Sequence, residues 1–229
     1  MGLKESGLRG SLRNVSVGID AIPDEEDLHA RYDFREYDAT STSDFDDLSG
    51  NGRDLINGSI TDVSESINGN QAANLDGSGD GVRSDSFSDI LPATFATVLR
   101  VDGSAEDAHT ITQTNDSEFA AIEWQGGDNE TEWRISRGES FVADGTSINA
   151  KLITGYIESG SNDVLRVDQQ EFSGDGGGLD WNIHELGINT LSDRNFEGAI
   201  GAHLVWNGDK RDIIDDIESY LIDEFDLEL

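Results

Sequence analysis

The chain has 229 residues and no cysteine, which suits one large β domain or two small ones and excludes disulfides and thiol chemistry. Its 48 acidic residues against 15 basic ones give a formal net charge of −33. A surface this acidic repels phosphate backbones and anionic membranes, so neither nucleic acid nor a membrane surface is expected as a partner. No run of about eighteen apolar residues predicts a membrane span, and no signal-peptide pattern opens the chain.

The balance among charged residue types indicates adaptation to high salt. Asp (30) outnumbers Glu (18), and there are only 3 Lys beside 12 Arg. Disorder is the alternative, but apolar residues recur with strand and helix periods along the chain. At about 1 M salt the Debye length falls to about 3 Å, which screens the self-repulsion. We therefore expect a halophile's protein whose fold loosens in dilute buffer.

The first twenty residues differ in charge from the rest. This segment contains three basic residues, Lys4, Arg9 and Arg13, and two acidic residues, Glu5 and Asp20, so its net charge is +1 (3 − 2). We predict an N-terminal arm over residues 1–24 that anchors the protein to a partner through the three basic residues. A frayed terminus is the alternative.

Residues 25–229 are predicted to form one β-rich domain. A helical turn and a strand at Ala30–Tyr37 come first, then a turn-dense segment at Ser43–Leu55 and a strand at Asn70–Asp76. Further strands are expected at Thr94–Val101, His109–Thr114, Phe119–Trp124, Glu132–Arg137, Asn149–Glu158, Val164–Gln169 and Trp181–Leu186. About ten to twelve strands at near-regular spacing indicate a sandwich or barrel.

A strand and an amphipathic helix close the chain. The spacing of Ile200, Ala202, Leu204 and Trp206 places them on one face of the strand by period two. After an Asn-Gly turn, the helical face consists of Ile213, Ile217, Tyr220, Leu221 and Phe225. The charges at the two ends of this helix oppose the helix dipole, because Lys210 and Arg211 lie near its start and Asp226 and Glu228 lie at its end. High salt would screen this unfavourable interaction.

Three motifs in order resemble the concanavalin A-like lectin/glucanase superfamily in its laminin-G-like branch. They are the turn Asp47–Gly52, the strand and turn at Ile67–Val82, and the closing strand and helix with Gly198, Ile200, Trp206, Tyr220 and Leu221. Leu75 stands where the family commonly has Phe, and Ala202 or His203 replaces a usual acidic residue. The resemblance implies an all-β, two-sheet antiparallel jelly-roll sandwich with one C-terminal helix.

The arm is similar to N-termini of virion proteins from tailed viruses that infect halophilic archaea. This shorter resemblance implies a non-enzymatic virion component exposed to a high-salt medium: a capsid turret or decoration, or a tail-fibre or receptor-binding part. The arm would bind other virion proteins, and the sandwich would face host glycans or the S-layer. A homo-oligomer, trimeric or pentameric, is expected. The alternative is a cellular glycan-binding module.

No catalytic motif is found. Glycosidases of this superfamily commonly carry Glu-x-Asp-x-x-Glu on one strand, and the sequence contains no such motif. Its nearest clusters are Glu118 with Glu123 and Glu130 with Glu132. We therefore expect a protein that is not an enzyme and needs no cofactor.

Metal binding through histidine is not expected, because the four histidines are far apart in sequence and each reads as a strand or surface residue. His184 and His203 are predicted to face the polar sides of their strands. Laminin-G-like domains often bind calcium, so Asp76, Asp80 and Asp85 around the Gly77–Gly81 turn are candidate calcium ligands, although Asp-Gly turns need no metal.

Two further features of the sequence are interpreted as structural rather than ligand-binding. All four tryptophans lie in alternating strands, so core packing is favoured over stacking on sugar rings. The glycine-rich Ser173–Gly178 segment lacks the lysine of a phosphate loop and is interpreted as a flexible loop.

Overall fold

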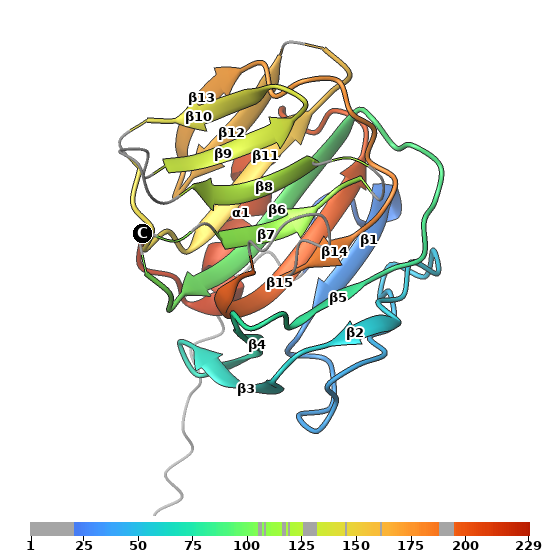
Figure 1. The fold of residues 1–229 in the computed structure, drawn as a ribbon, viewed down its shortest axis with the longest axis vertical. Helices are drawn as coiled ribbons and strands as arrows, with labels where there is room; N and C mark the ends of the chain where they lie inside the picture. The colour runs from blue at the N-terminus through green and yellow to red at the C-terminus, as the bar shows by residue number, and fades with distance from the viewer. Residues whose placement is uncertain are drawn as a thin grey trace, which may run out of the picture.

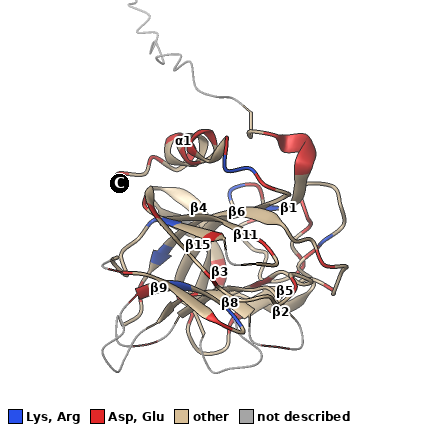
Figure 2. Cartoon of the chain, turned by 90° about the horizontal axis from the view of Figure 1, so that it is seen from above, with Lys and Arg blue, Asp and Glu red and all other residues tan. Residues whose placement is uncertain are grey.

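The protein is a two-sheet antiparallel β-sandwich with a single C-terminal helix across one face (Figures 1 and 2). The computed structural model describes residues 21–104, 107, 109–115, 118, 120–125, 132–144, 146–160, 162–187 and 195–229. This is the jelly-roll class that the sequence predicts. No helix in this part of the chain is long and apolar enough to cross a membrane.

The larger sheet is built around the long strand β15. Its strand order is β13 (Gln170–Gly174), β12 (Asp163–Val167), β11 (Leu152–Ile157), β6 (Ala93–Val101), β15 (Glu197–Asn207), β4 (Asn70–Asp76) and β3 (Asp62–Ile67). The strand β1 (Leu28–Asp33), preceded by a 3₁₀ turn at Glu25–Asp27, pairs with the second half of β15, beyond β4. All these pairs are antiparallel.

The smaller sheet has seven strands. Their order is β10 (Ser140–Ala143), β9 (Glu132–Arg137), β8 (Ala120–Gln125), β7 (His109–Gln113), β14 (Glu185–Leu186), β5 (Gly81–Arg83) and β2 (Asn57–Ser59). Strands β8 and β9 correspond to the predicted strands at Phe119–Trp124 and Glu132–Arg137 and pair antiparallel, and Trp133 and Ile135 of β9 are fully buried. Arg134 and Ser136 therefore project from the outer face of this sheet.

Two apolar clusters hold the layers together. The first lies between the sheets and contains Phe95, Trp133 and Trp181. The second lies between the larger sheet and the helix α1 (Ile214–Phe225), which buries Ile217 and Leu221 against it. The predicted apolar face of the helix is thus confirmed, and the helix covers the outer face of the larger sheet (Figure 2).

The prediction that Ile200 shares a face with Ala202, Leu204 and Trp206 is wrong. The β15–β6 register shifts between Ile200 and Ala202, so the strand has a β-bulge at Gly201. Ile200 consequently packs between the sheets, whereas the other three residues pack under the helix. A strict period of two fails wherever one extra residue is inserted into a strand.

The charge pattern of the helix also differs from the prediction. The helix begins only at Ile214, and its first turn carries Asp215 and Asp216. Their negative charges interact favourably with the positive end of the helix dipole. Lys210 lies before the helix, and its Nζ is 2.5 Å from Asp27 and 3.0 Å from Asp24. These ion pairs tie the start of the domain to its end.

The side chain of Asp47 stabilises the turn Asp47–Gly52, which is the first of the three motifs that resemble the superfamily. Its Oδ1 accepts hydrogen bonds from the backbone amides of Arg31 (3.0 Å) and Ser49 (2.9 Å), and its Oδ2 accepts one from the Ser49 hydroxyl (2.8 Å). Gly50 and Gly52 have φ of 80° and 70°, the left-handed region that favours glycine.

Several strand boundaries differ from the prediction. Only Glu185–Leu186 of the predicted strand at Trp181–Leu186 is extended and paired, because the preceding residues form a loop that packs into the core. Strands β2, β3, β10 and β13 were not predicted, since they are short edge or near-edge strands with little apolar alternation.

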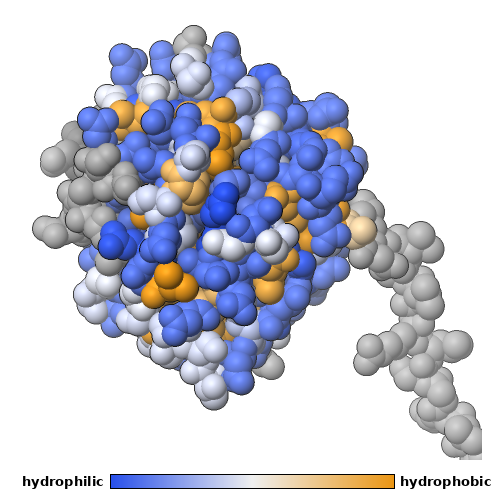
Figure 3. All heavy atoms as spheres, turned by 90° about the vertical axis from the view of Figure 1, so that its right-hand side faces the viewer, coloured by the Kyte–Doolittle hydropathy of each residue, from blue (hydrophilic) through white to orange (hydrophobic). Residues whose placement is uncertain are grey.

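The face of the molecule shown in Figure 3 is mainly hydrophilic, with apolar residues in several separate patches. Among the described residues, only Ile56 (46% exposed) and Leu229 (48%) are large exposed apolar side chains. The domain also begins earlier than predicted: Ile22 packs in the cluster under the helix, and the Pro23 carbonyl accepts a hydrogen bond from Trp206 Nε1 (3.0 Å).

Candidate functional site

A shallow groove forms where three glycine-containing turns meet at the β10–β13 end of the sandwich. The β9–β10 turn, the β11–β12 turn and the loop after β13 enclose about 580 Å³, and a neighbouring hollow of about 600 Å³ shares Gly138 and Leu179 with it. We call this surface the rim groove. Its lining is Glu118, Ser136, Arg137, Gly138, Glu139, Ser159, Gly160, Asp175, Gly177, Gly178 and Leu179.

A buried ion pair supports the groove from below. Arg137 and Asp163 are both fully buried, and Arg137 Nη1 lies 3.6 Å from Asp163 Oδ2. The guanidinium also donates hydrogen bonds to the carbonyls of Leu179 (2.8 Å from Nε) and Glu158 (2.9 Å from Nη1). Burial raises the pKa of Asp163 to about 6, against the opposing effects of Arg137 and of two backbone amides. The pair therefore ties together the two turns and the loop that form the groove.

The glycine run after β13 packs tightly against this ion pair. A Cβ on Gly177, whose φ is 96°, would lie 2.0 Å from the Arg137 carbonyl oxygen. One on Gly176 would lie 2.6 Å from Asp163 Oδ2, which accepts a hydrogen bond from the Gly176 amide (3.1 Å). The interpretation of Ser173–Gly178 as an unconstrained loop therefore misses its role: two of its glycines allow close backbone approach.

The lining gives the groove a defined chemistry. Exposed carboxylates come from Glu118, Glu139 and Asp175, and a hydroxyl comes from Ser159, while Leu179 supplies a small apolar surface. Among the described lining residues the one cation is Arg137, which turns its guanidinium into the protein and offers no charge to a ligand. Such a surface accepts hydrogen bonds from hydroxyl groups, which are short and strong when the acceptor is ionised. It disfavours anions.

The candidate calcium ligands do not form one group. The Asp76 carboxylate accepts hydrogen bonds from the amide (2.8 Å) and hydroxyl (2.6 Å) of Ser78, whereas Asp80 accepts one from Thr61 (2.5 Å). Asp85 accepts a long one from Asn57 (3.4 Å). In the described ranges, no three His, Cys, Asp or Glu side chains are placed to hold a metal ion.

Three of the four histidines meet in the core although they are far apart in sequence. His29 and His203 lie on strands, as expected, whereas His184 lies in the loop before β14. The ring centroids of His29 and His184 are 5.3 Å apart, and those of His184 and His203 are 6.1 Å apart. Both His184 and His203 are fully buried between the sheets rather than on polar faces. Burial lowers the pKa of His29 to about 4 and of His203 to about 3, and lowers that of His184 strongly.

The tryptophans and Glu123 named in the sequence analysis do not line the groove. Trp124, Trp133, Trp181 and Trp206 are all buried, as expected of core residues. Glu123 lies on the outer face of the smaller sheet and is held by Arg134, whose Nη2 is 2.6 Å away. The anchor residues Lys4, Arg9 and Arg13 lie outside the described residues.

Comparisons with known proteins identify the fold. No protein-family model matches the chain, and no curated protein matches it either. Among solved structures, it is similar to domain 4 of AbnA, an extracellular arabinanase from Geobacillus stearothermophilus in complex with arabinotriose (18% identity, TM-score 0.55, 79% of this chain and 92% of that one). It is also similar to Trypanosoma rangeli sialidase in complex with sialic acid (11%, 0.61, 89% and 34%) and to the binding domain of Paraclostridial Mosquitocidal Protein 1 (11%, 0.57, 86% and 52%). At these identities the likeness defines a β-sandwich and nothing finer.

The groove was not predicted from the sequence. Arg137, Asp163 and Gly177 lie on three separate segments, and only the folded topology brings them together. The signal in the sequence was the recurrence of glycine in three turns, which does not indicate that the turns are neighbours.

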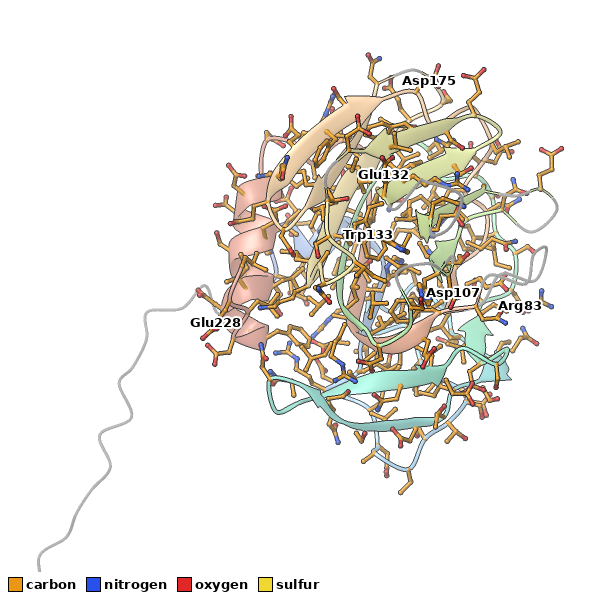
Figure 4. All side chains as sticks on the ribbon, turned by 60° about the vertical axis from the view of Figure 1, so that its left-hand side comes forward. Arg83, Asp107, Glu132, Trp133, Asp175 and Glu228 are labelled. Carbon is orange, nitrogen blue, oxygen red and sulfur yellow. The ribbon has the colours of Figure 1, made fainter. Side chains whose placement is uncertain are left out.

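Figure 4 shows where the rim groove lies in the molecule: Asp175 lies at the groove end, and Arg83 of β5 lies far from it.

Proposed function

We propose that this protein is a non-enzymatic glycan-binding module that holds a neutral oligosaccharide in the rim groove. The observation that supports it most directly is the described lining of the groove, which consists of three exposed carboxylates, a hydroxyl and glycine backbone and includes no available cation. Sugar hydroxyls donate hydrogen bonds to carboxylates, and a shallow groove accommodates an extended chain.

The solved structures to which the fold is similar support a glycan as the general class of ligand. Two of them hold arabinotriose or sialic acid, and another is an arabinofuranosidase with arabinofuranosyl-xylobiose (13% identity, TM-score 0.56, 79% of this chain and 50% of that one). This support is an analogy of fold, and the choice of a neutral ligand rests on the groove itself.

Binding without hydrolysis is proposed because the sequence contains no Glu-x-Asp-x-x-Glu motif. A glycosidase needs two carboxyl groups on either side of one bond, about 5–10 Å apart. Glu123 is committed to Arg134, and Glu118 lies in the groove on a separate loop. Incubation with polysaccharides followed by a reducing-end assay should detect no turnover, and steady product release would contradict this part of the proposal.

A screen of immobilised glycans in molar salt tests the binding proposal. We expect retention on neutral arabinose-, xylose- or hexose-containing oligosaccharides and none on sulfated ones, because the groove offers carboxylates to hydroxyl donors. Failure to retain any neutral glycan above the level of a heat-denatured sample would reject it.

For the biological setting, we propose a surface component of a tailed virus of halophilic archaea, such as a turret, decoration or receptor-binding part. The support is the acidic, lysine-poor composition and the basic segment with Lys4, Arg9 and Arg13. The arm would bind other virion proteins, and the groove would contact host glycans or the S-layer. A cellular glycan-binding module of a halophile is the second candidate.

Deletion of residues 1–20 separates these two settings. We expect the truncated protein to fold and keep glycan binding but to lose association with its particle. Sedimentation with the particle at the wild-type level would show that the arm is not the anchor, and electron microscopy of the intact assembly would distinguish a trimer from a pentamer.

A further inference from the structure

A second, smaller pocket lies at the opposite edge of the seven-stranded sheet, beside β2. It has a volume of about 190 Å³ and is lined by Gly52, Arg53, Asp54, Ile56, Asp85, Ser86 and Phe87. We call it the Arg53 pocket. Its volume equals roughly six water molecules of the liquid, which is room for one sugar-sized group rather than for a chain.

Arg53 differs from the protein's other arginines. In the described part of the chain, every arginine is ion-paired with a carboxylate except Arg53 and the exposed Arg83. In a chain with 48 acidic residues, a half-buried arginine left without a carboxylate partner is unusual. Its charge is therefore available to a ligand.

The side chain of Arg53 is nevertheless held in place. Its Nε donates to His29 Nε2 (3.3 Å), its Nη1 donates to the Asn51 carbonyl (2.8 Å), and the guanidinium lies 5.3 Å from the centre of the Phe87 ring. Its backbone amide donates to Asp47 Oδ2 (3.2 Å). No described residue accepts a hydrogen bond from its Nη2. A fixed guanidinium that forms no ion pair with a described carboxylate is preorganised for an oxyanion.

The partner on the inner side cannot neutralise this charge. Because arginine always donates, His29 Nε2 must be the unprotonated acceptor, so the imidazole is neutral. Burial and, second, the Arg53 charge lower the pKa of His29 to about 4. Asp54, one of the two carboxylates that line the pocket, already accepts a hydrogen bond from the Asp47 amide (2.7 Å).

The rest of the lining defines the ligand. Asp54 and Asp85 add negative charge that disfavours a dianion such as phosphate, but both accept hydrogen bonds from hydroxyl groups. Ile56, 46% exposed, and Phe87 offer an apolar surface to C–H groups. From this lining we propose that the Arg53 pocket binds a single uronate-type sugar acid, with its carboxylate on Arg53 and its hydroxyls on the two aspartates.

Titration of the full chain with sodium glucuronate, glucose and inorganic phosphate, followed by NMR in salt that keeps the fold intact, tests this site. We expect saturable glucuronate binding, with glucose and phosphate at least about tenfold weaker. Arg53→Gln should weaken glucuronate binding at least about tenfold, and the matched control Arg83→Gln should change it less than about twofold. The bound carboxylate should also raise the pKa of His29, because it offsets the Arg53 charge.

Equal binding of glucose or phosphate, or equal losses in Arg53→Gln and Arg83→Gln, would overturn the proposal, as would the absence of saturation. If Arg53→Gln does not fold, Ile56→Glu places a repelling charge in the pocket at an exposed position and should abolish glucuronate binding. Blocking the rim groove by Ser159→Trp should leave glucuronate binding unchanged. The binding proposals for the rim groove and for the Arg53 pocket can therefore be rejected independently of each other.

Discussion

At the scale of single residues, Gly177 shows how much the groove depends on close backbone contact. Its φ of 96° and its 2.0 Å Cβ approach to the Arg137 carbonyl make any side chain costly there. Gly177→Ala should lower the free energy of unfolding by about 1–3 kcal/mol or more, since strain and a backbone clash add. Denaturant unfolding in molar salt measures it.

Gly178 is the matched control for that substitution. It is adjacent in sequence and has no positive φ, and a Cβ added there would meet no atom within 4 Å. Gly178→Ala should therefore change stability by less than about 0.5 kcal/mol. Equal effects of the two substitutions would show that the close approach to Arg137 does not shape the loop.

The buried histidines make stability depend on pH. Their folded pKa values lie below the ordinary 6.5, so the unfolded chain binds more protons and stability falls as the pH drops from 6.5 towards the folded values. Asp163, raised to about 6, acts in the opposite direction between about pH 4 and 6. His203→Phe should remove up to about 1.4 kcal/mol per pH unit from the slope below pH 6.5. Unfolding free energies measured from pH 7 to 4.5 check this, and an unchanged slope would contradict it.

At the scale of elements, the helix α1 holds the outer face of the larger sheet through a few side chains. Ile217 is fully buried, whereas Ile222 on the same helix is only half-buried. Ile217→Ala should cost about 2–5 kcal/mol and Ile222→Ala clearly less. If thermal or denaturant unfolding gives the two variants the same stability, the helix does not pack as described.

Sequence patterns predicted elements better than they predicted the groove. The strand at Asn70–Asp76 has the predicted bounds, and Trp133 and Ile135 face the core as their alternation requires. The pattern failed at Ile200, where one inserted residue reverses the faces. The groove could not be predicted, because Arg137 of β9 and Asp163 of β12 are separated by two strands along the chain and lie in different sheets. Only the packing of one sheet on the other brings them together.

At the scale of the whole molecule, we propose that the charge of −33 makes the stability of the fold depend on salt. Acidic residues occur on both sheets and on the helix (Figure 2). We propose that molar salt screens their repulsion, so circular dichroism should show loss of structure between molar salt and dilute buffer. Identical spectra in the two buffers would contradict the adaptation to salt.

The central claim is that the rim groove binds a neutral glycan. Calorimetric titration of the best neutral oligosaccharide from the screen into the wild type, Ser159→Trp and Ser219→Trp tests it most directly. Both serines are exposed, but only Ser159 lines the groove, whereas Ser219 lies on the helix. We predict that Ser159→Trp weakens binding at least about tenfold and that Ser219→Trp leaves it unchanged. Unchanged affinity in Ser159→Trp would contradict binding in the groove.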